Sequence, residues 1–500
     1  MTTKKQIIRP EQNRLRYLAG WLLSGLCLLA QVGLAQSEHP AKWQGQVDVD
    51  GWAASEQAMP FWLRANQWGT VPLTTPAGRL GASIWKPYRT DTASRARRFD
   101  WAVGAQVVGN AATDSRVLLP ELYGKVRWKS VELSVGRWRQ LTGLGDSTLS
   151  SGFINGSGNA LPVPKVQLAT VGYVPLGFTR KFVALNAGFV HGWFTGAYIQ
   201  GSYLHQKYLY VRLGKPASRF KGYVGINHEV QWGGQADYLI GSTAAVNGKL
   251  PSQFKYYPYV VLGKRPDSWQ TDDYSSFDGA YWFGNGLGST DLGLDLTTSQ
   301  GTWFLYHQHI YDDFSGLVWQ NVPDGLTGLS WRRNPTVTPH WLNRVIVEYL
   351  TTMNQSGPTF DYTAAYQGDD NYFNHGQYRE GWSYLGNTIG TPFIGPQREL
   401  QPSAQGAQFF PNNRLKMLYL GASGQFGRAI DWTLRLSFSQ NYGTYSSPYA
   451  TPYGQLSYLS SVRWTLPRLP KIQAITSIAV DRGRLLPPST GVLVGLRKNW

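Results

Sequence analysis

The residues best suited to catalysis are one serine and a few histidines. Gly145-Asp146-Ser147 contains a serine that could act as a nucleophile, and a serine hydroxyl needs a general base beside it in order to react. In enzymes with this type of serine the base is usually a histidine with an aspartate three residues before it, and none of the eight histidines has that spacing. We therefore predict that the chain has no catalytic residue and is not an enzyme.

A second group of residues could bind a metal. His307 and His309 would share one face of a strand, and Asp312 and Asp313 follow just beyond. Two imidazoles at this spacing could ligate one ion. The alternative, which we adopt, is that both histidines are polar residues facing the inside of a barrel. The glycines of Gly284–Gly288 lack the spacing of a dinucleotide loop, so we predict neither metal nor cofactor.

The segment Tyr362–Trp382 has the chemistry of sugar recognition. Aromatic rings cover the apolar face of a pyranose, and carboxylates, amides and arginine fix its hydroxyl groups. The alternative is a loop that folds on itself and only caps the structure. The predicted polysaccharide-binding residues are Tyr366, Asp369, Asp370, Asn371, Tyr372, His375, Tyr378, Arg379 and Trp382.

Alternating strands are the elements that would position these loops. Between Leu122 and Trp128 every second residue is apolar or glycine, while Lys125, Arg127 and Lys129 fall on the other face. The chain turns near Ser130 and the alternation resumes, which predicts a hairpin with one lipid-facing and one wet face. Similar alternation recurs at Phe99–Val107, Leu209–Leu213 and Trp432–Phe438. A soluble β-sandwich also alternates and is the alternative fold.

Composition and the last strand favour a membrane barrel. Charged residues are 15% of the chain, against about 25% in ordinary globular domains, and aromatic residues are 14%. Gly491–Trp500 alternates and ends on an aromatic residue, as the closing strand of an outer-membrane barrel does. We predict an all-β fold, a transmembrane antiparallel barrel of roughly 18 strands in a single domain.

The N-terminus indicates export. Five basic residues before Tyr17 precede an apolar stretch, and the small residues up to Ala35 suit a signal peptidase. We expect residues 1–35 to be a cleaved signal peptide, 36–45 a short N-terminal segment and 46–500 the barrel; an uncleaved membrane anchor is the alternative. The one cysteine, Cys27, would leave with the signal.

The chain is basic, and its long polar stretches would be mainly outer loops. Removing the five basic residues and one acid of the signal leaves +13 of the total charge of +17. This excess would suit lipid phosphates, an acidic polymer or an anion-selective pore, and nucleic acid is an improbable partner for an exported barrel. The stretches expected to form outer loops are 143–164, 263–288, 358–408 and 440–454.

Several short motifs, in order along most of the chain, resemble the capsule assembly Wzi family of outer-membrane proteins. They are Leu119–Gly124, Gly136–Trp138, Ser150–Gly152, Ser157–Pro162, His228–Gly234, Tyr306–Asp312, Asn321–Gly325, Asp369–Asn374 and Gly390–Phe393.

The resemblance implies a barrel of about 18 strands that binds surface polysaccharide and helps attach a capsule to the cell. Better-known members of that family carry a periplasmic helical bundle before the barrel. Here Gln46–Arg89 is broken by prolines and glycines and begins with strand-like alternation, which predicts a first strand instead.

The sequence thus predicts a non-enzymatic, polysaccharide-binding barrel of the cell outer membrane. Its expected partners are surface or capsular polysaccharide and outer-membrane lipids, lipopolysaccharide included. A transport channel and a barrel-embedded lipid or glycan hydrolase are the alternative functions.

Overall fold

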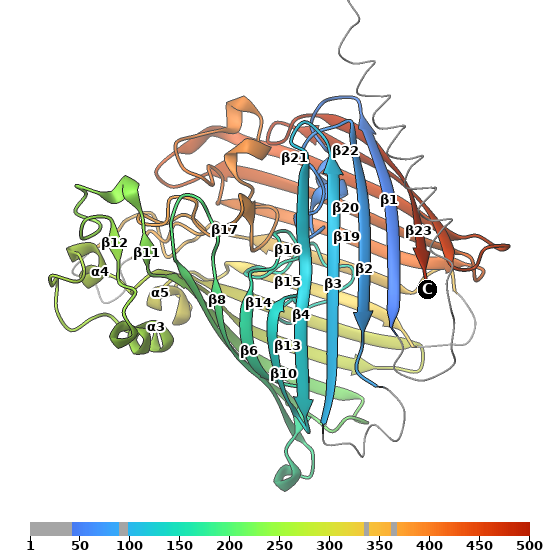
Figure 1. The fold of residues 1–500 in the computed structure, drawn as a ribbon, viewed down its shortest axis with the longest axis horizontal. Coiled ribbons are helices and arrows are strands. Elements are labelled where there is room, and N and C mark those ends of the chain that lie inside the picture. The colour runs from blue at the N-terminus through green and yellow to red at the C-terminus, as the bar shows by residue number, and fades with distance from the viewer. Residues whose placement is uncertain (1–42, 90–98, 335–339, 362–367) are drawn as a thin grey trace, which may run out of the picture.

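A computed structural model describes residues 43–89, 99–334, 340–361 and 368–500, and it shows one closed antiparallel barrel (Figure 1). The sheet has 19 strands, of which the two-residue β7 pairs only with β8, so 18 strands form the ring. The ring closes where β1 pairs with β23 over nine residue pairs, from Gln46 opposite Asn499 to Ala54 opposite Gly491. The predicted barrel of about 18 strands is confirmed.

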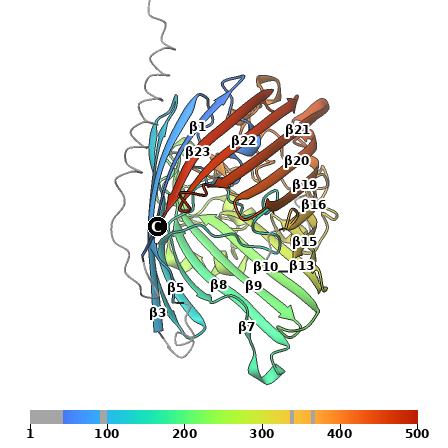
Figure 2. The same cartoon turned by 90° about the vertical axis from the view of Figure 1, so that its right-hand side faces the viewer.

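The ring strands follow the order of the chain, as Figure 2 shows from the side. They are β1 (Gln44–Ala54), β2 (Ala77–Lys86), β3 (Phe99–Ala111), β4 (Arg116–Trp128), β5 (Val131–Arg137), β6 (Lys165–Thr170), β8 (Val183–Trp193), β9 (Tyr203–Leu213), β10 (Phe220–Trp232), β13 (Asn285–Thr297), β14 (Gly301–Tyr311), β15 (Gly325–Arg333), β16 (Arg344–Thr351), β19 (Leu415–Phe426), β20 (Ile430–Gly443), β21 (Pro448–Thr465), β22 (Ile472–Gly483) and β23 (Ser489–Asn499), with β7 at Val174–Pro175.

Alternation along the strands sets an apolar exterior against a polar interior. On β4, Leu122 and Trp128 are more than half exposed on the outer face. Lys125 and Arg127 point inward, where they pair with Glu132 and Asp100 across 3.7 and 3.2 Å. A Lys or Arg at the lipid midplane costs about 2–4 kcal/mol, which explains this register. Lys129 differs from the prediction: it is exposed in the β4–β5 turn, where its φ is +52°.

The two ends of the barrel differ in the length of their connections. The start of β1, the C-terminus and turns as short as 298–300 and 427–429 lie at one end, which we assign to the periplasm. The long connections 138–164, 233–284 and 352–414 lie at the other end, as expected for outer loops. The expected outer loop 440–454 is mostly strand, because β20 and β21 continue through it and leave only residues 444–447 between them.

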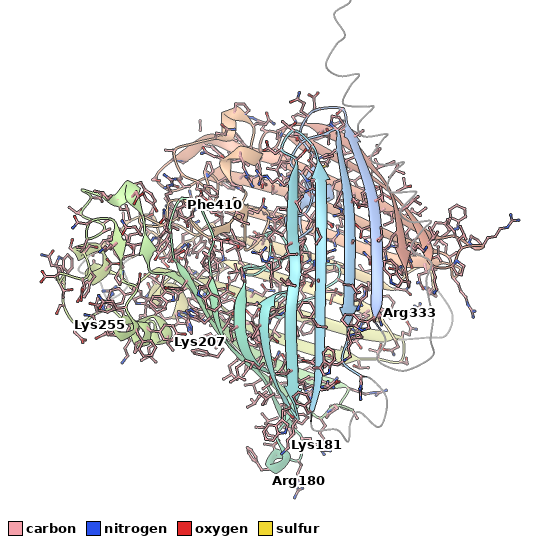
Figure 3. All side chains as sticks on the ribbon, viewed as in Figure 1. Arg180, Lys181, Lys207, Lys255, Arg333 and Phe410 are labelled. Atoms are coloured by element: carbon pink, nitrogen blue, oxygen red, sulfur yellow. The ribbon has the colours of Figure 1, made fainter. Side chains whose placement is uncertain are left out.

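The outer loops fill the barrel interior near the outer end. The β1–β2 connection carries the short helix α2 (Phe61–Arg64), whose Trp62 is 2% exposed and packs 5.3 Å from the ring of Tyr419 on the wall. The same hydrophobic core includes Ile154 from the β5–β6 connection and Phe410 from the β16–β19 connection (Figure 3). The Gln46–Arg89 segment begins in β1, the first strand that its alternation predicted, and continues through α2 to β2.

The β5–β6 connection crosses the interior and is anchored to the wall by buried polar groups. Glu348 accepts hydrogen bonds from the Ser150 hydroxyl and the Ser151 amide, each at 2.7 Å. Gln308 receives the amide of Ile154 at 2.9 Å and donates to the carbonyl oxygen of Leu144 at 2.8 Å. These bonds give the buried side chains of Glu348 and Gln308 their partners, so the loop has a defined path through the lumen.

The β10–β13 connection covers the outside of the wall instead of its inside. It contains β11 (Gly234–Gln235), β12 (Lys249–Leu250), α3 (Tyr257–Leu262) and α4 (Ser276–Ala280), which project to the left in Figure 1. Tyr257 lies 5.5 Å from the outward-facing ring of His205. The short helix α5 (Phe314–Leu317) and the turn after it cover the adjoining strand β14 in the same way.

His307 and His309 are therefore placed differently from the prediction. Both lie on the face of β14 that carries the exposed Leu305, so they point outward and not into the lumen. Trp319 stacks on His309 at 4.6 Å, and the His309 Nε2 atom lies 3.1 Å from the carbonyl oxygen of Gly316. The two rings are covered by the β14–β15 connection.

In the part of the chain that the structure describes, no helix combines the length and the apolarity needed to cross a bilayer.

Candidate functional site

A cavity of about 730 Å³ lies at the outer end, between three connections. Its size falls within the range of about 300–1,000 Å³ that is typical of small-ligand sites. Its walls come from the end of the β10–β13 connection, from the start of the β14–β15 connection and from the β16–β19 connection. The lining residues used below are Phe277, Tyr281, Trp282, Asp312, Asp313, Phe360, Asp369, Asp370, Asn371, His375, Arg379 and Ala407.

One wall of this outer cavity is aromatic. Phe277 in α4 and Tyr281 directly after it have ring centroids 4.7 Å apart. Tyr281 lies 5.9 Å from Phe360 of the β16–β19 connection, and the half-buried Trp282 follows it in the chain. Helix α4 is fixed by a capping box in which Ser275 and Asp278 exchange hydrogen bonds, so the wall is held in place.

Five of the nine predicted residues line the outer cavity: Asp369, Asp370, Asn371, His375 and Arg379. The guanidinium carbon of Arg379 lies 4.6 Å from the ring of Tyr238. Burial lowers the pKa of His375 to about 4, so its ring is neutral at pH 7 and its Nδ1 atom accepts the amide hydrogen of Gln377 at 3.1 Å. Tyr366 lies outside the described residues.

The other three predicted residues belong to the core of the outer loops. Tyr372 and Tyr378 are 0% exposed and Trp382 is 1% exposed. The Trp382 indole donates to the carbonyl oxygen of Asn155 at 3.0 Å, and the Tyr372 hydroxyl donates to Asp324 at 3.2 Å. A sugar has no free ring face to stack on at these three positions, because all three side chains are buried. They form the core that a loop of this length needs.

Carboxyl groups also line the outer cavity, among them Asp312, Asp313 and Asp370. Burial, and next the charge of Asp313, raises the pKa of Asp370 to about 8. Burial and the neighbouring carboxyls also raise the pKa of Asp312 well above its usual range. The Ser356 hydroxyl donates to Asp370 at 2.7 Å. At pH 7 a protonated carboxyl here can donate a hydrogen bond to a ligand as well as accept one.

Raising the pH should loosen the outer cavity around Asp370. The pKa of Asp370 lies above its unfolded value, so its contribution favours the folded loop at low pH. That contribution falls as the pH rises from about 4 and is lost above about 8. A nitroxide on Ala407→Cys should become more mobile between pH 6 and 9, and Asp370→Asn should remove the change. Equal pH dependence in the variant would contradict the assignment.

Sequence reasoning missed the aromatic wall. Phe277, Tyr281 and Trp282 stand in the stretch Phe277–Phe283, whose four aromatic residues among seven were a usable signal. The spacing of Asp312 and Asp313 after the two histidines indicates metal ligation and gives no sign of a sugar site. In the described ranges, no three or more His, Cys, Asp or Glu side chains are arranged to hold a metal ion.

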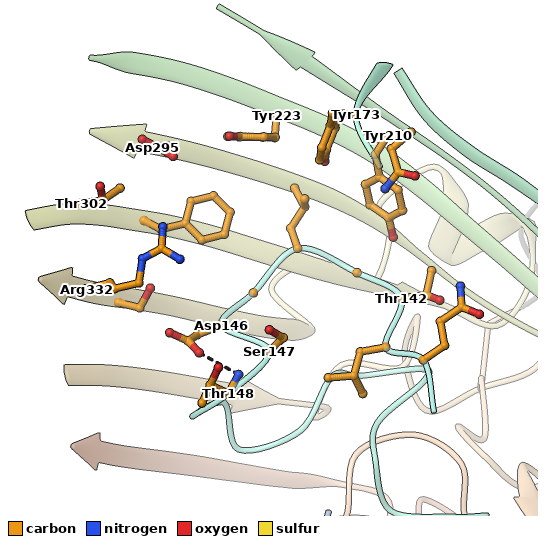
Figure 4. Close-up of a pocket in the computed structure, with 18 of the residues that line it drawn as sticks. Thr142, Asp146, Ser147, Thr148, Tyr173, Tyr210, Tyr223, Asp295, Thr302 and Arg332 are labelled. Atoms are coloured by element: carbon orange, nitrogen blue, oxygen red, sulfur yellow. Dashed lines mark hydrogen bonds between the residues drawn. The ribbon is translucent and has the colours of Figure 1, made fainter. Parts of the chain in front are cut away.

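Ser147 lies in a different cavity, inside the lumen. Its neighbours Asp146 and Thr148 are joined by a 2.8 Å hydrogen bond from the Thr148 amide (Figure 4). None of the described residues that line this second cavity is a histidine.

Comparison with known proteins gives the family. The sequence pattern described as capsule assembly protein Wzi matches residues 88–440. The solved structure of Escherichia coli Wzi, an outer-membrane protein described as a carbohydrate-binding β-barrel involved in group 1 capsule assembly, superposes with a TM-score of 0.56 at 13% identity, covering 90% of this chain and 83% of that one. Pseudomonas aeruginosa OccK5 has a TM-score of 0.45 at 9% identity, covering 93% of this chain and all of its own.

Acinetobacter baumannii OccAB2 has a TM-score of 0.46 at 8% identity, covering 93% of this chain and 99% of that one. No curated protein sequence matches the chain. The match to the family pattern spans well over half of the sequence, and the closed barrel is the fold of the Escherichia coli protein. The chain belongs to the capsule assembly protein Wzi family.

Proposed function

We propose that this outer-membrane barrel binds surface polysaccharide in the outer cavity and assists capsule assembly without catalysing a reaction. One observation carries the proposal: aromatic rings, carboxyls, amides and two arginines converge on a cavity at the outer end. This mixture suits a sugar, whose CH face packs on rings while its hydroxyl groups need polar partners. The Escherichia coli family member is described as carbohydrate-binding, which supports the same ligand class.

The aromatic wall and the charged residues of the outer cavity would bind different parts of the sugar. Tyr281 and Trp282 offer ring surface to a pyranose, and Arg379, which lines the same cavity, offers a planar donor for a hydroxyl or a carboxylate. Asp370, with its raised pKa, adds a carboxyl that can donate as well as accept. Outer-membrane lipids, lipopolysaccharide included, would be the partners of the apolar outer face.

Two observations weigh against the alternative functions. The β5–β6 connection is anchored across the lumen through Glu348 and Gln308, which opposes a wide transport channel. Ser147 shares its cavity with no histidine among the described residues, which opposes a serine hydrolase of the usual type.

Weakening the outer cavity should release polysaccharide from cells. We expect the variant Tyr281→Ala, Trp282→Ala, Arg379→Gln to insert normally and to retain several-fold less surface polysaccharide, with loose polymer in the medium. Losing one stacking ring costs about 1 kcal/mol and losing a charged hydrogen bond about 1.5–3 kcal/mol. The assay is quantitation of cell-bound and released polysaccharide at equal amounts of inserted barrel.

A matched control changes two aromatic residues and one cation elsewhere on the β10–β13 connection. Phe254, Lys255 and Trp269 are exposed and do not line the outer cavity. The variant Phe254→Ala, Lys255→Gln, Trp269→Ala should retain polysaccharide like the wild type. If both triple variants behave alike, the outer cavity is not the binding site.

A further inference from the structure

A second cavity lies inside the barrel, on the periplasmic side of the β5–β6 connection. It has a volume of about 380 Å³ and is called the inner chamber here (Figure 4). Asp295 and Thr302 flank the short turn at 298–300, and Arg332 and Arg344 flank the connection 334–343, so this wall belongs to the periplasmic end. The other wall is the stretch Gln140–Thr148 of the β5–β6 connection.

Three aromatic rings form a continuous surface in the inner chamber. Tyr173 and Tyr223 meet edge to face at 5.6 Å, and Tyr223 meets Phe304 in the same way at 5.7 Å. They come from the β6–β8 connection, β10 and β14, so the barrel wall fixes their relative positions. An apolar surface of this kind inside a polar lumen suits the CH face of a sugar ring.

Among the charged residues that line the inner chamber, Arg332 is the one whose guanidinium could bind an acidic ligand. Asp146 is paired with Arg344 at 2.9 Å, and Asp295 is paired with Lys221 at 3.6 Å. Arg332 is exposed to the chamber, and no acidic group of the described residues lies within 4.0 Å of it. Arginine presents a planar pair of donors that matches a carboxylate.

We infer that the inner chamber binds a short acidic saccharide of the uronic acid class, entering from the periplasm. The aromatic surface takes the sugar ring and Arg332 takes its carboxylate. Asn186 also lines the chamber; its Oδ1 atom accepts from the Thr170 hydroxyl, and its Nδ2 group can donate to a sugar hydroxyl. The inference does not rest on the proposed function, because the inner chamber and the outer cavity share no lining residue.

The first test measures binding by calorimetry with the purified full chain. The probes are α-1,4-digalacturonate and its neutral counterpart α-1,4-galactobiose. We expect the wild type to prefer the acidic disaccharide, and Arg332→Gln to weaken it at least about tenfold without changing the neutral one. The matched control is Arg333→Gln, the next residue, which lies on the outer face with its guanidinium 3.0 Å from His340 (Figure 3).

The second test reports the position and the side of access. Ser330 lines the inner chamber, and the chain's only natural cysteine is Cys27. With Cys27 replaced by Ser, a cysteine at position 330 should react with an impermeant maleimide only after the periplasm is opened, and digalacturonate should protect it. Equal binding by Arg332→Gln and the wild type, no preference for the acidic probe, or labelling that the probe does not reduce would overturn the inference.

Discussion

Deletion of Val492–Trp500 should abolish insertion into the outer membrane. These residues form most of β23, which pairs with both β22 and β1 and so closes the ring. The chain end is held as well, because Trp500 and Gly45 exchange two backbone hydrogen bonds at 3.1 Å. Without the strand, two edges with unpaired backbone groups would face lipid, where each such group costs several kcal/mol.

The measurement is the fraction of protein that stays in outer-membrane fractions after carbonate extraction. The matched control deletes the same number of residues, Lys264–Asp272, from the β10–β13 connection, outside the ring strands. We expect the control to insert and the truncation to be lost to degradation or aggregates. Normal insertion of the truncated chain would show that the ring does not need β23.

Removal of the crossing loop should turn the barrel into a channel. Replacing residues 145–158 by a short Gly-Ser linker deletes Ser150, Ser151 and Ile154, the groups that bond to Glu348 and Gln308. The β1–β2 and β16–β19 connections still fill part of the outer end, but a ring of about 16–18 strands is wide enough for an aqueous pore once the loop that crosses it is removed. We expect the single-channel conductance of the variant in planar bilayers to exceed that of the wild type several-fold.

A point substitution in the barrel wall also tests whether the crossing loop obstructs the lumen, and it leaves the loop itself unchanged. Glu348→Ala leaves the Ser151 amide without its buried acceptor, a loss of about 1–3 kcal/mol for the loop anchor. Its conductance should fluctuate between closed and open levels, and Glu348→Gln, which retains an acceptor, should stay near the wild type. A wild-type conductance as high as that of the linker variant would mean that the loop does not obstruct the lumen.

The barrel could be predicted from the sequence because its signal is local. Alternation at Leu122–Trp128 reports directly on which side chains face lipid, and it placed Lys125 and Arg127 correctly. The exception, Lys129, sits in a tight turn, where the period of two no longer holds.

The folding of the loops could not be predicted in the same way, because it depends on distant contacts. Ser151 is 197 residues from the carboxylate that holds it, and Trp382 is 227 residues from the carbonyl oxygen that it bonds. Nothing near His307 or His309 indicates that α5 and the turn after it cover them from outside. The composition of Tyr362–Trp382 is typical both of a loop core and of a sugar site. In the structure some of its residues are buried in the loop core and others line the outer cavity.

Direct binding of purified capsular polysaccharide to the purified full chain tests the central claim most directly. Surface plasmon resonance would compare the wild type with the outer-cavity variant Tyr281→Ala, Trp282→Ala, Arg379→Gln and with the control Phe254→Ala, Lys255→Gln, Trp269→Ala. We predict saturable binding by the wild type and the control, and binding at least about tenfold weaker by the outer-cavity variant. Equal binding by all three proteins, or no binding by the wild type, would contradict the account.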